Sequence, residues 1–249
     1  MFFQIFKKNY ILKEFIIHTN PLNQIDFSRN KLVVTINAHS YCVSKSNSLF
    51  RSALINSNIV LPDGIGIVWG YNFLNKQKIK KIAGYDLFNF LIDKLNDQSG
   101  SVFFLGSSLD NLECIKQKCK IDFPKLKVEY YSPPFKKEFT KSDNEKMIAA
   151  VNDFKPDVLF LGMTAPKQEI WAYENKDYLK VKNICCVGAV FDFYSGKTKR
   201  PSGFWINLGL EWFPRFLNEP KRLFYRNFIS TPKFILEILS IKIFKKGIL

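Results

Sequence analysis

Polar residues follow four short apolar runs of the chain, and they could bind or activate a substrate. The four groups occupy residues 35–39, 62–66, 105–108 and 162–169. The second group contains Asp63, a carboxylate that could act as a general base. Ligands of open α/β sheets bind at the carboxyl ends of the strands. If the apolar runs are parallel strands, all four groups belong to one candidate site.

Each group also has an ordinary structural explanation. Pro-Asp-Gly is a turn signature, which favours a structural role for Asp63. The segment 106–108 could present backbone N–H groups to a phosphate or simply cap a helix. Gln168 and Glu169 would lie in the first turns of a helix, where a glutamate complements the helix dipole. His39, at a strand end, is expected to be a hydrogen-bonded structural histidine.

The elements that must position these groups are visible in the apolar pattern. Helical periodicity is clear over 85–96, and over 142–153 with Ser142 as the expected N-cap and Glu145 three residues on. Strands that alternate with helices predict an α/β, Rossmann-like fold, a mostly parallel sheet with helices on both faces. The expected strands are 32–36, 58–61, 101–105, 127–130, 158–161 and 184–187.

The composition narrows the function classes. The 249 residues carry a net charge of +15, which indicates an anionic partner such as nucleic acid, a membrane surface or a phosphorylated substrate. Five cysteines and two histidines argue against a disulfide scaffold and a His-rich zinc site. No apolar stretch reaches the roughly 20 residues of a membrane span. No signal-peptide pattern begins the chain, so a cytoplasmic location is expected.

The basic charge gathers at the C-terminus. Residues 197–249 hold eleven Lys and Arg against three Glu, and four of the six arginines. Two units are therefore predicted, an α/β core over 1–195 and an Arg- and Lys-rich helical appendage over 196–249. A helix over 233–244 has a broad apolar surface that suits an anionic lipid interface. Ordinary packing onto the core, an oligomer contact or a solvated basic helix would explain the same pattern.

The motifs together resemble the WecG/TagA/CpsF glycosyltransferases, glycosyltransferase family 26. Their order and spacing agree from about residue 31 to 235. The pattern differs at Ser107, Thr164 and Pro201, in loops expected to face the sugar nucleotide. The matching segments are Thr35-x-Asn37, Pro62 to Trp69, Gly84 to Leu87, Phe103 to Gly106, Ala165 to Glu169, Gly188 to Phe193, Gly209 to Trp212, Arg215 and Glu219-Pro220-x-Arg222.

The resemblance implies an inverting transfer of an N-acetylmannosamine-type sugar. The implied donor is a UDP-sugar, and the implied acceptor is polyprenyl-diphosphate-linked GlcNAc. The reaction would serve teichoic-acid, capsule or other cell-surface polysaccharide synthesis at the inner face of the cytoplasmic membrane. The family also has dimers, so a homo-oligomer that uses segment 1–17 is a further expectation.

Family positions map onto this chain residue by residue. Asp63 matches the proposed general base, and its ordinary pKa of roughly 4 would leave it ionised at neutral pH. Thr35, Asn37 and Gln168 match pocket residues that orient the reacting groups, and Glu169 is the alternative base. Further substrate contacts are expected from Gly64, Gly106, Ser107, Thr164, Glu169, Arg215, Arg222 and Arg226.

No Asp-x-Asp pair is present at the position expected for a metal, since Asp192-Phe193-Tyr194 holds a single carboxylate. The leaving diphosphate is therefore expected to be stabilised by arginines, without a metal or other cofactor.

The alternatives are a different UDP-hexose donor, or a non-catalytic sugar-nucleotide-binding protein on the membrane surface. A nucleic-acid-binding protein is disfavoured because no recognised motif for it appears. An NAD-dependent enzyme is disfavoured because Asn37-Ala38-His39-Ser40 stands where a glycine-rich fingerprint would follow the first strand.

Overall fold

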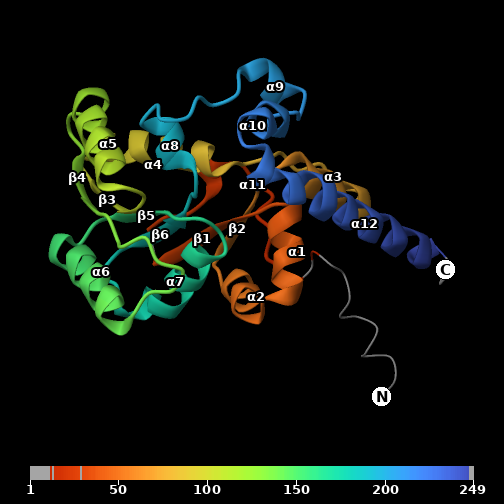
Figure 1. Ribbon diagram of the computed structural model, residues 1–249, viewed down its shortest axis with the longest axis horizontal. Helices are drawn as coiled ribbons and strands as arrows, with labels where there is room; N and C mark the ends of the chain where they lie inside the picture. The colour runs from red at the N-terminus through yellow and green to blue at the C-terminus, as the bar shows by residue number, and fades with distance from the viewer. Residues whose placement is uncertain (1–11, 13, 29, 247–249) are drawn as a thin grey trace.

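A computed structural model describes residues 12, 14–28 and 30–246 (Figure 1). Six parallel strands form one sheet in the order β2-β1-β6-β5-β3-β4, which confirms the predicted fold class. Each predicted strand is present, with ends that differ by at most one residue. The strands are β1 (Lys31–Ile36), β2 (Ile59–Pro62), β3 (Ser101–Gly106), β4 (Lys127–Tyr131), β5 (Val158–Gly162) and β6 (Asn183–Cys186).

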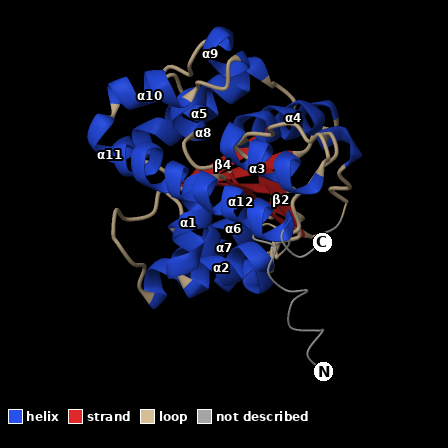
Figure 2. Ribbon diagram, turned by 90° about the vertical axis from the view of Figure 1, so that its right-hand side faces the viewer, coloured by secondary structure: helices blue, strands red, loops and turns tan. Residues whose placement is uncertain are grey.

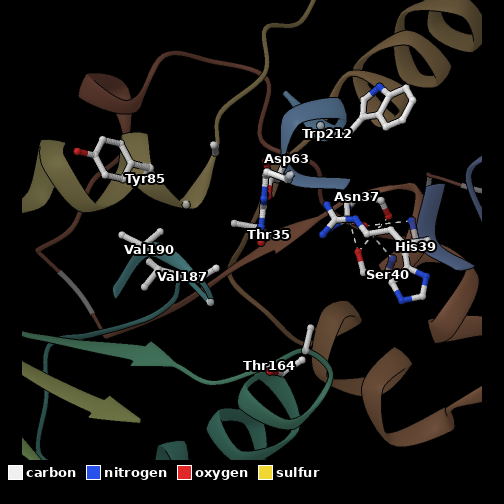
Figure 3. Close-up of a pocket in the computed structure, with 18 of the residues that line it drawn as sticks. Thr35, Asn37, His39, Ser40, Asp63, Tyr85, Thr164, Val187, Val190 and Trp212 are labelled. Atoms are coloured by element: carbon white, nitrogen blue, oxygen red, sulfur yellow. Dashed lines mark hydrogen bonds between the residues drawn. The ribbon is translucent and has the colours of Figure 1, made fainter. Parts of the chain in front are cut away.

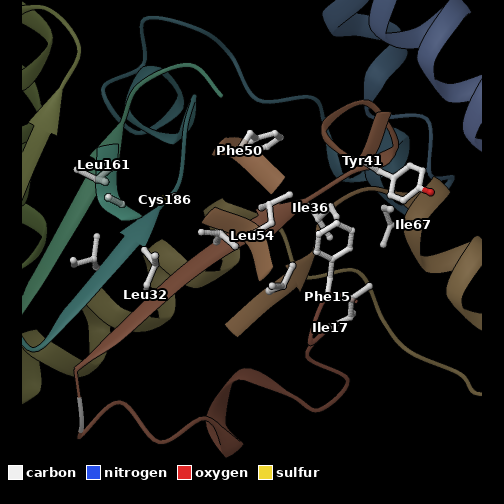
Figure 4. Close-up of a cluster of buried hydrophobic side chains, with 14 of the residues drawn as sticks. Phe15, Ile17, Leu32, Ile36, Tyr41, Phe50, Leu54, Ile67, Leu161 and Cys186 are labelled. Carbon is white, nitrogen blue, oxygen red and sulfur yellow. The ribbon is translucent and has the colours of Figure 1, made fainter. Parts of the chain in front are cut away.

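Helices cover both faces of the sheet because its strands are apolar on both. Leu32, Val34 and Ile36 of β1 join one buried cluster, while Val33 points to the other. Figure 4 shows the first cluster, in which Phe50 and Leu54 pack beside β1. This cluster includes residues of α1 (Ala38–Ser46), α2 (Ser48–Ile55), α3 (Ile65–Asn75), α6 (Lys141–Phe154) and α7 (Lys167–Asn175). The second includes residues of α4 (Gly84–Asp97), α5 (Leu109–Asp122) and α8 (Val190–Tyr194).

The start of α6 differs from the sequence prediction. Thr140, not Ser142, is the N-cap, and its hydroxyl accepts a hydrogen bond from the Asp143 N–H at 3.2 Å. The Asp143 carboxylate in turn accepts from the Thr140 N–H at 2.9 Å. The prediction with Ser142 and Glu145 was wrong because the Thr140–Asp143 pair satisfies the same orphan amides two residues earlier.

After α8 the chain forms a run of helices that leaves the sheet. Figures 1 and 2 show α9 (Gly203–Asn207), α10 (Trp212–Asn218) and α11 (Pro220–Phe224) gathered at one end of the molecule. A π-helical turn, η4 (Tyr225–Ser230), leads into α12 (Thr231–Lys246). No helix of the described residues is long and apolar enough to cross a bilayer. The short 3₁₀ turns are η2 (Leu22–Gln24) and η3 (Lys176–Tyr178).

The sequence pattern suggested that the broad apolar surface of α12 faces a membrane. In the structure, part of that surface is buried inside the protein. Phe234 and Ile238 are fully buried against α3, where only Gly70 leaves room for them. An added Cβ at Gly70 would stand 3.0 Å from the Phe234 ring. Leu236 and Ile243 remain exposed, at 67% and 69%. Core packing, the alternative explanation, therefore accounts for one side of this helix.

Replacement of Phe234 by alanine is expected to destabilise the fold by about 3–5 kcal/mol, because the cavity left beside Gly70 and Tyr41 cannot collapse fully. Urea unfolding of the full chain measures this change. The matched control is Leu236→Ala on the same helix, where exposure predicts a change within about 0.5 kcal/mol. Equal effects of the two substitutions would contradict the packing described for α12.

Candidate active site

A cavity of about 460 Å³ opens at the carboxyl ends of β1, β2, β5 and β6 (Figure 3). Residues from α9 to η4 line its other side, so the C-terminal helices lie over the edge where the polar loops end. This is the place where parallel α/β sheets bind ligands.

Most of the predicted site residues meet in this cavity. Its lining includes Thr35, Asn37, Asp63, Gly64, Thr164, Gln168, Glu169, Arg215, Arg222 and Arg226. Gly106 and Ser107 are not among the lining residues. Gly106 instead passes so close to β5 that an added Cβ would lie 2.7 Å from the Gly162 carbonyl oxygen. The Ser107 hydroxyl accepts from the Asn111 amide at 2.8 Å, and that amide also donates to Asp192 at 3.0 Å.

Asp63 is placed by the first residues after β2. Its N–H donates to the Ile36 carbonyl at 2.8 Å, which continues the β1–β2 ladder by one residue. Gly64 then adopts a φ of 103°, a conformation that suits glycine, and α3 begins at Ile65. Burial raises the pKa of Asp63 above its ordinary value, and the Arg226 guanidinium acts in the opposite direction. The expectation of an ordinary pKa at this position is therefore corrected.

Asn37 and His39 are held by the start of α1. The Asn37 side-chain oxygen accepts from the backbone N–H groups of His39 and Ser40, both at 3.0 Å, so it caps the helix. His39 Nδ1 lies 2.9 Å from the Ser230 hydroxyl of η4. Burial and then the nearby Arg226 lower the pKa of His39. The predicted hydrogen bond of His39 is therefore present, and the residue also belongs to the cavity lining.

Gln168 and Glu169 lie at the start of α7 and line the cavity. Gln168 Oε1 accepts from the backbone N–H groups of Met163, at 3.3 Å, and Gly188, at 3.1 Å. Gln168 Nε2 donates to Glu169 Oε1 at 2.8 Å. Glu169 is only 1% exposed, and this burial raises its pKa to about 7.

The appendage contributes the arginines of the site. Arg215 stacks over the Phe193 ring at 5.1 Å, and Arg222 pairs with Glu219. Burial lowers the pKa of Arg226, and the charge of Asp63 opposes this shift. The part of the chain that the structure describes holds no cluster of three or more His, Cys, Asp or Glu suited to a metal ion.

Sequence reasoning missed several residues of the site. Lys81 pairs with Glu211 of the appendage at 2.5 Å, and Arg200 lies 4.2 Å over the Tyr85 ring and 3.5 Å from Asp86. The sequence has four lysines between residues 76 and 81, and no local signal separates Lys81 from the others. The cavity lining also includes Asp192, Trp212 and Asn227.

Three lining residues carry a buried polar atom without a hydrogen-bond partner in the described structure. These atoms are Glu169 Oε2, Arg200 Nε and Asn227 Nδ2. Buried polar groups are normally paired, so a polar ligand in this cavity would satisfy atoms that the protein leaves unpaired.

Comparisons with known proteins find relatives that match most of the chain. A protein of Bacillus spizizenii named N-acetylglucosaminyldiphosphoundecaprenol N-acetyl-beta-D-mannosaminyltransferase is 28% identical, across 90% of this chain and 92% of the relative. Proteins of the same name from Bacillus subtilis and Staphylococcus aureus are 30% and 23% identical, across 87% and 86% of this chain and 82% of each relative. The model of the Glycosyl transferase WecG/TagA/CpsF family matches residues 18–247. The chain therefore belongs to the WecG/TagA/CpsF family of glycosyltransferases.

Proposed function

We propose that this enzyme transfers an N-acetylmannosamine-type sugar from a UDP donor to polyprenyl-diphosphate-linked GlcNAc, with inversion at the anomeric carbon. The observation that carries the proposal is a cavity whose lining brings the Asp63 carboxylate, directly after β2, together with arginines of the C-terminal helices. The names of the relatives support the sugar and the acceptor.

In this proposal Asp63 is the general base. It accepts the proton of the acceptor hydroxyl while that oxygen attacks the anomeric carbon. The bond between the sugar and UDP breaks, and UDP leaves with the electron pair. Thr35 and the Asn37 amide group lie at the end of β1 beside Asp63, where they could orient the acceptor or the sugar (Figure 3).

Arg215, Arg222 and Arg226 would stabilise the negative charge that grows on the departing diphosphate. Each is placed by a different part of the appendage, α10, α11 and η4. We therefore propose that catalysis needs no metal ion.

Glu169 is a weaker candidate for the base. One of its oxygens already accepts from Gln168, and its pKa of about 7 leaves a large fraction of it protonated at neutral pH. A different UDP-hexose donor would bind in the same cavity, and so would a sugar nucleotide that the protein binds without transfer. Both alternatives are outcomes of the tests below.

The proposed place of action is the inner face of the cytoplasmic membrane. Helices α9 to η4 expose large apolar side chains beside the basic residues Lys221 and Arg222, a combination that favours anionic lipid. The exposed side chains are Phe204, Leu208, Leu217, Phe224, Tyr225 and Phe228. The proposed homo-oligomer contact falls on segment 1–17, of which residues 1–11 and 13 lie outside the described residues.

Replacement of Asp63 by asparagine is expected to lower the rate of transfer by about 10² to 10⁴, because the amide cannot take the proton. The assay uses UDP-N-acetylmannosamine and a short-chain polyprenyl-diphosphate-GlcNAc in detergent. Asp110→Asn, an exposed carboxylate outside the cavity, is the matched control. A collapse in Glu169→Gln with an active Asp63→Asn would move the base to Glu169.

Transfer is expected to continue at full rate in excess EDTA, because the arginines replace the metal of other glycosyltransferases. The measurement compares initial rates with and without the chelator. Loss of activity that Mg²⁺ or Mn²⁺ restores would overturn the proposal of metal independence.

The double substitution Leu217→Ser and Phe224→Ser is expected to lower the affinity for anionic vesicles at least about tenfold. The reason is that burial of each exposed apolar side chain in lipid stabilises the bound state by roughly 1.5–3 kcal/mol. Co-sedimentation with phosphatidylglycerol vesicles measures it. Ile121→Ser, an equally apolar and exposed position on α5, is the control. Unchanged binding of the double variant would show that α10 and α11 are not the lipid contact.

A further inference from the structure

Only one of the two carboxyl oxygens of Glu169 has a hydrogen-bond partner among the described residues. Oε1 accepts the hydrogen bond from Gln168 at 2.8 Å, whereas Oε2 is buried without a partner among the described residues. The side chain is 1% exposed yet belongs to the cavity lining. A buried polar atom without a partner destabilises the protein unless something bound in the cavity satisfies it.

Gln168 determines which oxygen of Glu169 is available. Its Oε1 is occupied by the N–H groups of Met163 and Gly188, so its amide cannot be reversed without the loss of both bonds. Nε2 must then face Glu169 Oε1, which acts as the acceptor. The remaining oxygen, Oε2, is the one that can carry a proton or meet a ligand.

The surroundings of Glu169 favour its uncharged form. Burial is the main cause that raises its pKa to about 7, and hydrogen bonds from Gln168 and from the Glu169 backbone oppose this shift only in part. The titratable neighbour is the Cys186 thiol of β6, whose own pKa burial raises well above the ordinary value. Cys186 is therefore uncharged too. An uncharged carboxylic acid donates a hydrogen bond, which a carboxylate cannot do.

The loop before α7 and helix α10, which carries Arg215, line different sides of the cavity (Figure 3). In Figure 3 the loop with Thr164, which precedes α7, lies opposite Trp212 of α10, and Thr35 and Asp63 lie between them. Arg215 belongs to the same helix as Trp212. If the arginines hold the diphosphate and Asp63 faces the reacting carbon, the sugar ring reaches toward α7.

We propose that Glu169 is a specificity-determining residue that donates a hydrogen bond from Oε2 to an oxygen of the donor sugar. This inference rests on the proposed function, since it assumes a UDP-sugar in the cavity. The cavity lining also includes the apolar side chains of Met163, Val187 and Val190, which suit the methyl of an acetamido group. Glu169 thus contacts the sugar and not the nucleotide.

The test measures the dissociation constants of UDP and of UDP-N-acetylmannosamine for the full chain by calorimetry at pH 6. Glu169→Met keeps the length of the side chain but removes its polar atoms. It is expected to weaken UDP-N-acetylmannosamine about 10- to 100-fold and UDP by less than about threefold. Glu169→Gln, which keeps an acceptor for Gln168 and a donor at the second position, should restore most of the sugar affinity.

A second measurement distinguishes this role from a structural one and does not depend on the Met variant. Glu169 is protonated below its pKa of about 7 and loses its donor proton above it. The wild-type affinity for UDP-N-acetylmannosamine should therefore fall roughly tenfold between pH 6 and pH 8, while Glu169→Gln shows no such fall relative to UDP.

Equal losses for UDP and the UDP-sugar in Glu169→Met, or the same pH dependence in wild type and Glu169→Gln, would overturn the inference and leave the proposed function standing. A wild-type protein that binds neither ligand would overturn the proposed function itself.

Discussion

The C-terminal helices bring several arginines together, and carboxylates of the core and of the same helices lie beside them. Burial is the largest cause that lowers the pKa of Arg226, the charges of Arg215 and Arg222 lower it further, and Asp63 opposes them. Other ion pairs join the appendage to the core, among them Lys81 with Glu211 and Arg200 with Asp86. A diphosphate bound over the carboxyl edge of the sheet would further balance the mutual repulsion of these arginines.

Apolar packing holds the other end of the same segment. Phe234 and Ile238 bury α12 against Gly70 of α3, and the Ser230 hydroxyl meets His39 of α1. The π-helical turn before α12 is therefore fixed by the core, and it carries Arg226 to the cavity. Such π turns occur frequently at functional sites, because they redirect side chains that a regular helix would point elsewhere.

Much of the site could be predicted from short segments. The strands are runs of apolar residues buried on both faces, and the polar residues directly after them must gather at one edge when the strands are parallel. Asn37, Asp63 and Thr164 follow this rule. Thr35 lies near the end of β1, and Gln168 and Glu169 begin the helix after β5, so the same edge places them as well. Gly106 ends β3 and Ser107 follows it, but both residues make contacts within the protein instead of lining the cavity. Gly106 approaches the backbone of Gly162 closely, and the Ser107 hydroxyl accepts a hydrogen bond from Asn111.

The sequence by itself determined the parallel sheet, the family and the loops that form the cavity, because these depend on local pattern and on motif spacing. Only the tertiary structure decided which face of α12 is buried and that Lys81 rather than its neighbouring lysines binds the appendage. It also decided that burial raises the pKa of Glu169 to about 7 and leaves one of its oxygens unpaired. Burial and pairing depend on residues far apart in the chain, so the charge and the bonding of a side chain are properties of the folded protein.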